Sequence, residues 1–136
     1  MIISLLKLDA LVAGIVSIFI VLVLHILAMI LILSLLSGLV SSDILYTMLR
    51  ILGIFCLAIP PYVAARVAFN NALLHSLIIG LVQSLLILMM MTQNFSWQGT
   101  LQYSVVGKMS FVIGAMLLLS LISGIIARWM NQKDKT

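Results

Sequence analysis

The chain has 136 residues, of which 65 % are hydrophobic and only 7 % are charged, whereas soluble domains carry roughly 25 % charged residues. A water-soluble fold of this length could not bury so much apolar surface, so the composition predicts that lipid surrounds the protein. The formal net charge is +4, but the basic residues are scattered singly, and this pattern does not indicate nucleic-acid binding.

The first apolar segment runs from about residue 10 to residue 40. It is far longer than the hydrophobic region of a signal peptide, which has roughly 7–15 residues, so we expect an uncleaved span. A transmembrane helix needs about 20 residues. The excess length would let the first helix tilt or project beyond the bilayer.

Three further apolar segments follow, each long enough to cross a bilayer as a helix. Ser42 or Asp43 is expected to cap the second helix, residues 69–71 to form a tight turn, and residues 93–103 to form a loop. The sequence therefore predicts a single all-α domain, 1–136, built as a four-transmembrane-helix bundle. The later spans and a short basic tail are placed at 44–68, 72–92, 104–128 and 129–136.

The basic residues predict the direction of the spans. One side of the predicted membrane collects five of them, and the other side has only Arg50 and Lys108. Because cytoplasmic segments are enriched in lysine and arginine, both termini are expected to face the cytoplasm. The aromatic residues agree, with Tyr46, Trp97 and Tyr103 at the outer interface and Tyr62 and Trp129 at the inner one. The five basic residues of the cytoplasmic side are Lys7, Arg66, Arg128, Lys133 and Lys135.

Two adjacent prolines, Pro60 and Pro61, lie inside the predicted second helix. Proline has no backbone N–H, so the helix is expected to bend there. Neighbouring helices would then have to pair the freed carbonyl groups of Ile54, Cys56 or Leu57.

Every predicted span carries a row of small residues, which lets helix backbones approach closely in lipid. This pattern favours a compact bundle over four loosely associated helices. The rows are Gly14, Ser17 and Ala28; Cys56, Pro60, Ala64 and Ala68; Ser76, Gly80 and Ser84; and Gly107, Ser110, Gly114 and Gly124.

His25 and Gln83 fall at similar depths in the first and third spans. Polar groups at this depth usually face the interior of a bundle. They could form a polar pair on a proton or substrate path, or a single interhelical hydrogen bond worth about 1 kcal/mol. The chain has no Glu, and its three acidic residues, Asp9, Asp43 and Asp134, fall at or beyond helix ends. This distribution argues against proton-coupled export.

Arg50 lies about two turns into the second span from its outer end. It could bind an anionic headgroup or substrate. Alternatively it extends to the interface, where the ring of Tyr46 could hold its guanidinium group.

Methionines concentrate in the predicted outer half of the spans. Thioether sulfur is a soft ligand suited to Cu(I), so a copper path is one interpretation. The other is that these side chains fill gaps in an apolar core, because consecutive methionines point in different directions. The residues concerned are Met29, Met48, Met89, Met90, Met91 and Met109, with Met116 near the midplane.

The patterns typical of enzymes and metal sites are missing from the sequence. It has a single cysteine, Cys56, and no paired-cysteine or His/Glu metal spacing. It also has no phosphate-binding glycine loop and no Ser–His–Asp set. We therefore predict no catalytic residue, no cofactor and no metal site, and we expect that the protein is not an enzyme.

Residues 62–80, YVAARVAFNNALLHSLIIG, resemble the hairpin between spans two and three in a group of small bacterial four-span membrane proteins of unknown function. This chain departs from that group at Pro60 and Pro61, where a glycine pair is usual, and at Ser76, where glycine is usual. The resemblance implies a fold, a topology and a place in the bacterial inner membrane, but no reaction. The matching positions are Tyr62, Ala64, Ala65, Arg66, Leu74, His75 and Gly80.

Arg66 and His75 are expected to lie close together across this hairpin. They could bind a lipid phosphate or the acidic groups of a partner, or act only as a topology anchor and a turn residue.

With almost no soluble mass, the chain has surfaces for interaction mainly inside the bilayer. The leading hypothesis is therefore a non-enzymatic multi-pass protein that contacts lipids and other membrane proteins, as a homo-oligomer or as an accessory subunit. The alternative is a small transporter or channel with a polar path around His25, Gln83 and Arg50.

Overall fold

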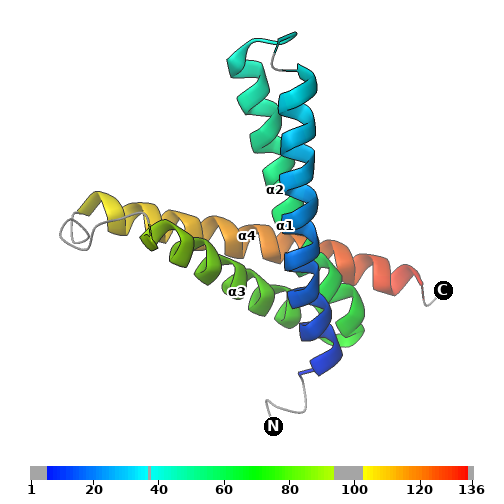
Figure 1. Ribbon diagram of the computed structural model, residues 1–136. Helices are drawn as coiled ribbons and strands as arrows, with labels where there is room; N and C mark the ends of the chain where they lie inside the picture. The colour runs from blue at the N-terminus through cyan, green and yellow to red at the C-terminus, as the bar shows by residue number, and fades with distance from the viewer. Residues whose placement is uncertain (1–5, 37, 94–102, 135–136) are drawn as a thin grey trace.

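The computed structural model describes residues 6–36, 38–93 and 103–134. In these ranges all regular structure is helical, so the all-α prediction is confirmed (Figure 1). The elements are α1 (Leu8–Leu36), α2 (Ser42–Ala68), the short 3₁₀ helix η2 (Phe69–Asn71), α3 (Ala72–Gln93) and α4 (Tyr103–Lys133). Trp97, most of the predicted loop 93–103 and Lys135 lie outside the described residues, as do the side chains of Met91, Tyr103 and Lys108.

Within the described residues, three helical segments are long and apolar enough to cross a membrane: Leu8–Leu36, Ser42–Met90 and Met109–Lys133. The middle segment contains both α2 and α3, which η2 separates. Two predicted limits need correction. Residues 38–40 lie after the end of α1, and residues 129–133, predicted as tail, continue α4.

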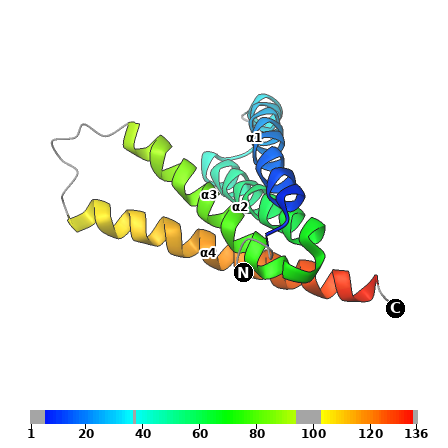
Figure 2. The same ribbon diagram turned by 90° about the horizontal axis from the view of Figure 1, so that it is seen from below.

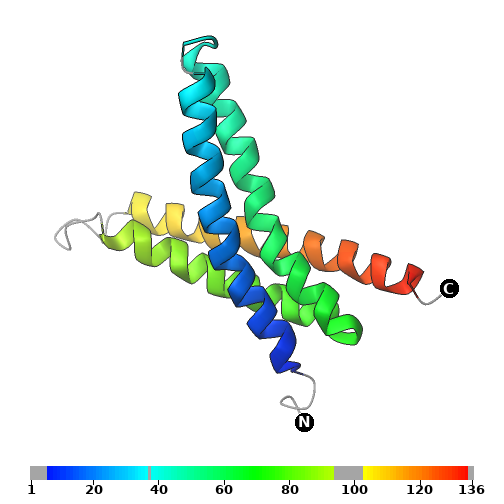
Figure 3. The same ribbon diagram turned by 45° about the vertical axis from the view of Figure 1, so that its right-hand side comes forward.

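The helices form two hairpins, one of α1 with α2 and one of α3 with α4. The hairpins meet at the end of the molecule that contains η2, and from there they run in different directions (Figures 1 and 3). The C-terminal end of α4 extends past the other helices, as Figure 2 shows from below. The four helices therefore pack together, as predicted for a compact bundle, only at the end that contains η2.

Small residues form the core where the hairpins meet. A Cβ atom added at Gly14 of α1 would lie 2.6 Å from Ile79 of α3 and 2.9 Å from Ala64 of α2. At Gly80 it would overlap the side chain of Ser120 on α4. These approaches confirm the predicted close packing of small residues.

The predicted row in the fourth span is only partly used. Gly124 packs tightly, since an added Cβ would lie 3.0 Å from Cβ of Ser76. Gly107 and Gly114 have no described neighbour within 4 Å of such an atom. The contact therefore involves the C-terminal half of α4, and the N-terminal half lies beyond it.

The helix α2 is continuous through Pro60 and Pro61, and both prolines are buried. A neighbouring helix does donate to this region, because the Ser123 hydroxyl bonds to the carbonyl of Ala58 at 3.1 Å. The sequence predicted pairing at the carbonyls of Ile54, Cys56 or Leu57, whereas the bond from Ser123 reaches the carbonyl of Ala58. Packing on a buried face holds the helix where the prolines remove two backbone donors.

The two ends of α2 differ in how they are capped. Ser41, and not Ser42 or Asp43, is the N-cap residue, and its side chain makes no capping hydrogen bond. At the other end the predicted turn is confirmed. Phe69 adopts a positive φ of 60°, and its N–H donates to the carbonyl of Ala65. This turn sends the chain back along α2 as α3.

We predict that Gly80→Ala lowers the free energy of unfolding by about 1–3 kcal/mol, because the added methyl group overfills the contact with Ser120. Gly114→Ala is the matched control, since it adds the same group where no described neighbour lies within 4 Å. Thermal unfolding in detergent micelles measures both changes. The double variant Gly80→Ala/Ser120→Gly should recover stability. Equal effects at Gly80 and Gly114 would contradict the packing described.

Candidate functional site

Two groups of polar side chains stand out, and the first joins the C-terminal ends of α2 and α4. Arg66 donates from Nη1 to Oδ1 of Asn131 at 2.8 Å, and its Nη2 lies 2.9 Å from Oδ2 of Asp134. Asn131 in turn donates through Nδ2 towards the carbonyl oxygens of Ala65 and Phe69, both at 3.4 Å. Arg66 therefore has its acidic partner within the chain.

Asn131 has the central place in this network. It is only 4 % exposed, and the carbonyl groups that it reaches lie at the C-terminal end of α2, where that of Ala65 also accepts the N–H of Phe69. The side chains of Arg66 and Asp134 are 31 % and 53 % exposed, so their ion pair is screened by solvent and contributes little. The buried amide is thus the stronger link.

His75 is completely buried in the first turn of α3. Its Nε2 accepts the backbone N–H of Lys7 at 2.9 Å, and its Nδ1 lies 2.9 Å from the carbonyl oxygen of Asn71. Both bonds are satisfied together when Nδ1 carries the hydrogen and donates it to Asn71. His75 therefore ties the residue before α1 to the start of α3.

One of the two interpretations of Arg66 and His75, that they bind a lipid phosphate or the acidic groups of a partner, finds no support in these contacts. Each side chain has its own partners within the chain, and neither ring nitrogen of His75 is free. Lys7 and Asn131 were missed by sequence reasoning, because a backbone donor and a single asparagine at a helix end give no pattern.

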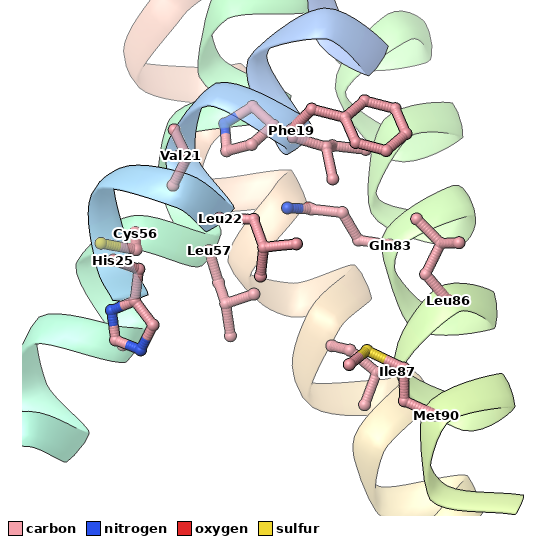
Figure 4. Close-up of a pocket in the computed structure, with 13 residues that line it drawn as sticks. Phe19, Val21, Leu22, His25, Cys56, Leu57, Gln83, Leu86, Ile87 and Met90 are labelled. Carbon is pink, nitrogen blue, oxygen red and sulfur yellow. The ribbon is translucent and has the colours of Figure 1, made fainter. Parts of the chain in front are cut away.

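The second polar group faces a cavity of about 350 Å³ between α1, α2 and α3 (Figure 4). Most of its lining is apolar, and His25, Cys56 and Gln83 are the polar or polarisable members. Gly53 on α2 leaves room for the imidazole, since a Cβ atom there would lie 3.7 Å from Cε1 of His25. The cavity is enclosed on part of its surface only.

His25 and Gln83 line this cavity without bonding to each other. His25 Nδ1 and Gln83 Oε1 are both buried and have no hydrogen-bond partner among the described residues. Figure 4 shows the two side chains projecting from α1 and α3, with Leu22 and Leu57 between them. The single interhelical hydrogen bond considered from the sequence is therefore not formed.

Arg50 does not belong to this group. It lies on α2 but is exposed and is not part of the cavity lining. The polar path around His25, Gln83 and Arg50 is thus not assembled by the described part of the chain, where only the first two face one cavity.

No group of three or more His, Cys, Asp or Glu side chains in the described ranges is placed to hold a metal ion. The methionines of the copper hypothesis are also dispersed. Met116 is buried, Met48 and Met89 are exposed, and Met90 lines the cavity.

Comparisons with protein-family models, with curated proteins and with solved structures found no match. The resemblance of residues 62–80 to a group of four-span membrane proteins therefore stays a prediction.

We predict that Asn131→Leu lowers the free energy of unfolding by about 1–3 kcal/mol, because it removes the hydrogen bonds of a buried amide to the carbonyl oxygens of Ala65 and Phe69 and to Nη1 of Arg66. Asp134→Asn removes only an exposed ion pair, so its effect should be no more than about 1 kcal/mol. Unfolding in micelles compares the two. An equal or larger loss for Asp134→Asn would refute this ranking.

We also predict that His75→Phe loosens the start of α1, because the Lys7 N–H loses its acceptor. The readout is hydrogen exchange of the backbone amides at residues 7–11, which should become faster. His25→Phe is the control, since His25 Nδ1 has no described partner to lose. If amide exchange at residues 7–11 is unchanged in His75→Phe, the bond to Lys7 does not hold this segment.

Proposed function

We propose that the protein is a small inner-membrane protein with four spans and both termini in the cytoplasm, which acts through contacts inside the bilayer. It would do so as a homo-oligomer or as an accessory subunit of a membrane complex. The observation that carries the proposal is the divergence of the two hairpins, which leaves long apolar helix faces that no described segment covers (Figure 3).

The polar contacts support this topology. The Lys7–His75 bond brings the start of α1 beside the start of α3, and the Arg66–Asp134 pair brings the ends of α2 and α4 together. Lys7 and Arg66 make these contacts, and Lys133 lies one residue before Asp134. Three of the basic residues on the predicted cytoplasmic side thus belong to the end where the hairpins meet. The turn between α1 and α2 lies at the opposite end of the first hairpin (Figure 1). An end rich in Lys and Arg is the cytoplasmic end of a multi-pass protein.

The small amount of chain outside the apolar helices supports a role through contacts with other proteins inside the bilayer. The described chain is nearly all helix, so it offers few surfaces outside the apolar region. Exposed apolar side chains alone are ordinary in lipid, where helices associate by close packing of their faces. Here the diverging halves lack such packing against the other hairpin (Figures 1 and 3). A protein partner would supply it.

The transporter alternative has less support, because its three polar residues are not brought to one path. His25 and Gln83 face the cavity and Arg50 does not.

Three exposed phenylalanines allow a direct test of the contact hypothesis. Phe19, Phe55 and Phe111 are 61 %, 68 % and 77 % exposed, and a photoreactive phenylalanine analogue can replace each of them. Phe19 also lines the cavity between α1, α2 and α3, whereas Phe55 and Phe111 do not. In native membranes we expect at least one position to give a protein adduct of discrete mass. An adduct of twice the monomer mass would indicate self-association. An adduct of any other discrete mass would indicate a different protein as partner, as expected of an accessory subunit.

The adduct should persist at low expression, which separates specific contacts from crowding. Lipid adducts alone at all three positions, together with a monomer in mild detergent, would refute the proposal.

A further inference from the structure

The amide of Gln83 is the most unusual polar group in the described part of the chain. Its side chain is only 4 % exposed, it lines the cavity between α1, α2 and α3, and its Oε1 has no described hydrogen-bond partner. An amide that is buried without a partner is unfavourable, because it gives up hydrogen bonds to water and gains none. A bound molecule that completes these bonds would remove the penalty.

The surroundings of Gln83 restrict the chemistry of such a molecule. The cavity wall consists mainly of aliphatic and aromatic side chains, such as Phe19, Leu22, Leu57 and Leu86. A water molecule in a protein interior normally needs two to four polar partners, and the other orphaned atom, His25 Nδ1, lies on the far side of Leu22 and Leu57 in Figure 4. An occupant should therefore be largely apolar.

Its polar group should be a hydroxyl. A primary amide both accepts through its oxygen and donates through its nitrogen, and a hydroxyl group also does both. An ether or a ketone can only accept, so it would leave Gln83 Oε1 unpaired. The volume of about 350 Å³ lies within the range of roughly 300–1,000 Å³ that is typical of small-molecule sites.

We propose that the cavity binds an apolar molecule that carries a hydroxyl group, either a free long-chain alcohol or a lipid with a free hydroxyl. The hydroxyl pairs with the amide of Gln83, and the hydrocarbon chain lies along Leu22, Leu57 and Leu86. His25 closes the opposite wall beside Gly53. This inference goes beyond the proposed contacts with other proteins and does not depend on them.

Photoaffinity labelling of the full chain in detergent micelles tests the proposal, with a diazirine derivative of octanol as the probe. We expect saturable labelling that maps to cavity residues of α1, α2 and α3. Unlabelled octanol should compete at a concentration about tenfold lower than methyl octyl ether, which has the same chain but no donor. Wild-type protein alone decides this comparison, so it does not depend on a variant that folds.

A pair of variants tests the role of the amide. Gln83→Leu should abolish the preference for octanol over the ether. Ser84→Ala is the matched control, because Ser84 neighbours Gln83 but is outside the cavity lining and bonds to the carbonyl of Leu81. The control should keep the preference. Competition by dioctanoylglycerol would identify lipid as the source of the hydroxyl, and its failure to compete would point to a free alcohol.

Several results would overturn the proposal. If methyl octyl ether and octanol compete equally well, the site does not recognise the hydroxyl group. Labelling that does not saturate, or that maps to the exposed helix faces, would show partition into the apolar surface without a site. Loss of cavity labelling in native membranes, where a protein partner could fill the space, would assign the cavity to that partner instead.

Discussion

Close approach of neighbouring side chains to the backbone at Gly14, Gly80 and Gly124 is the constraint on which the other features of the structure depend. At these points a methyl group would lie too close to a neighbouring helix. In lipid, apolar side chains gain little by leaving their solvent, so close packing of this kind has to hold the helices together. Gly14 of α1 lies against Ile79 of the other hairpin, whereas Gly80 and Gly124 join α3 to α4 within one hairpin. Beyond these contacts the two hairpins run in different directions (Figure 1).

The polar interactions of His75, Asn131 and Arg66 lie at the end where the hairpins meet, and they add to the helix packing there. His75 holds the segment before α1, and Asn131 with Arg66 holds the ends of α2 and α4. His75 and Asn131 are buried, so the loss of their hydrogen-bond partners would be unfavourable. Arg66 at the end of α2 and His75 at the start of α3 therefore have structural roles at this end. The buried polar atoms without a described partner, on His25 and Gln83, line the cavity instead.

The cavity follows from the divergence of the hairpins. Because α1 and α2 leave α3 at the core, the faces that carry His25 and Gln83 are separated by a space instead of packing together. Depth along a span is readable from sequence, and in the structure both residues line one cavity. Whether two polar groups at similar depth meet depends on the angle between helices, and that angle leaves no pattern in a single chain.

The sequence by itself determined four apolar helical segments, the turn at 69–71 and the use of small residues at the helix contacts, because length, hydrophobicity and side-chain size are local properties. Only the tertiary structure decided that the hairpins diverge, that Asn131 and not His75 is the partner of Arg66, and that Gln83 stays unpaired. These features depend on which residues, far apart in the chain, come within hydrogen-bonding distance. Small-residue rows occur in every predicted span, so only the packed structure selects which glycines are used.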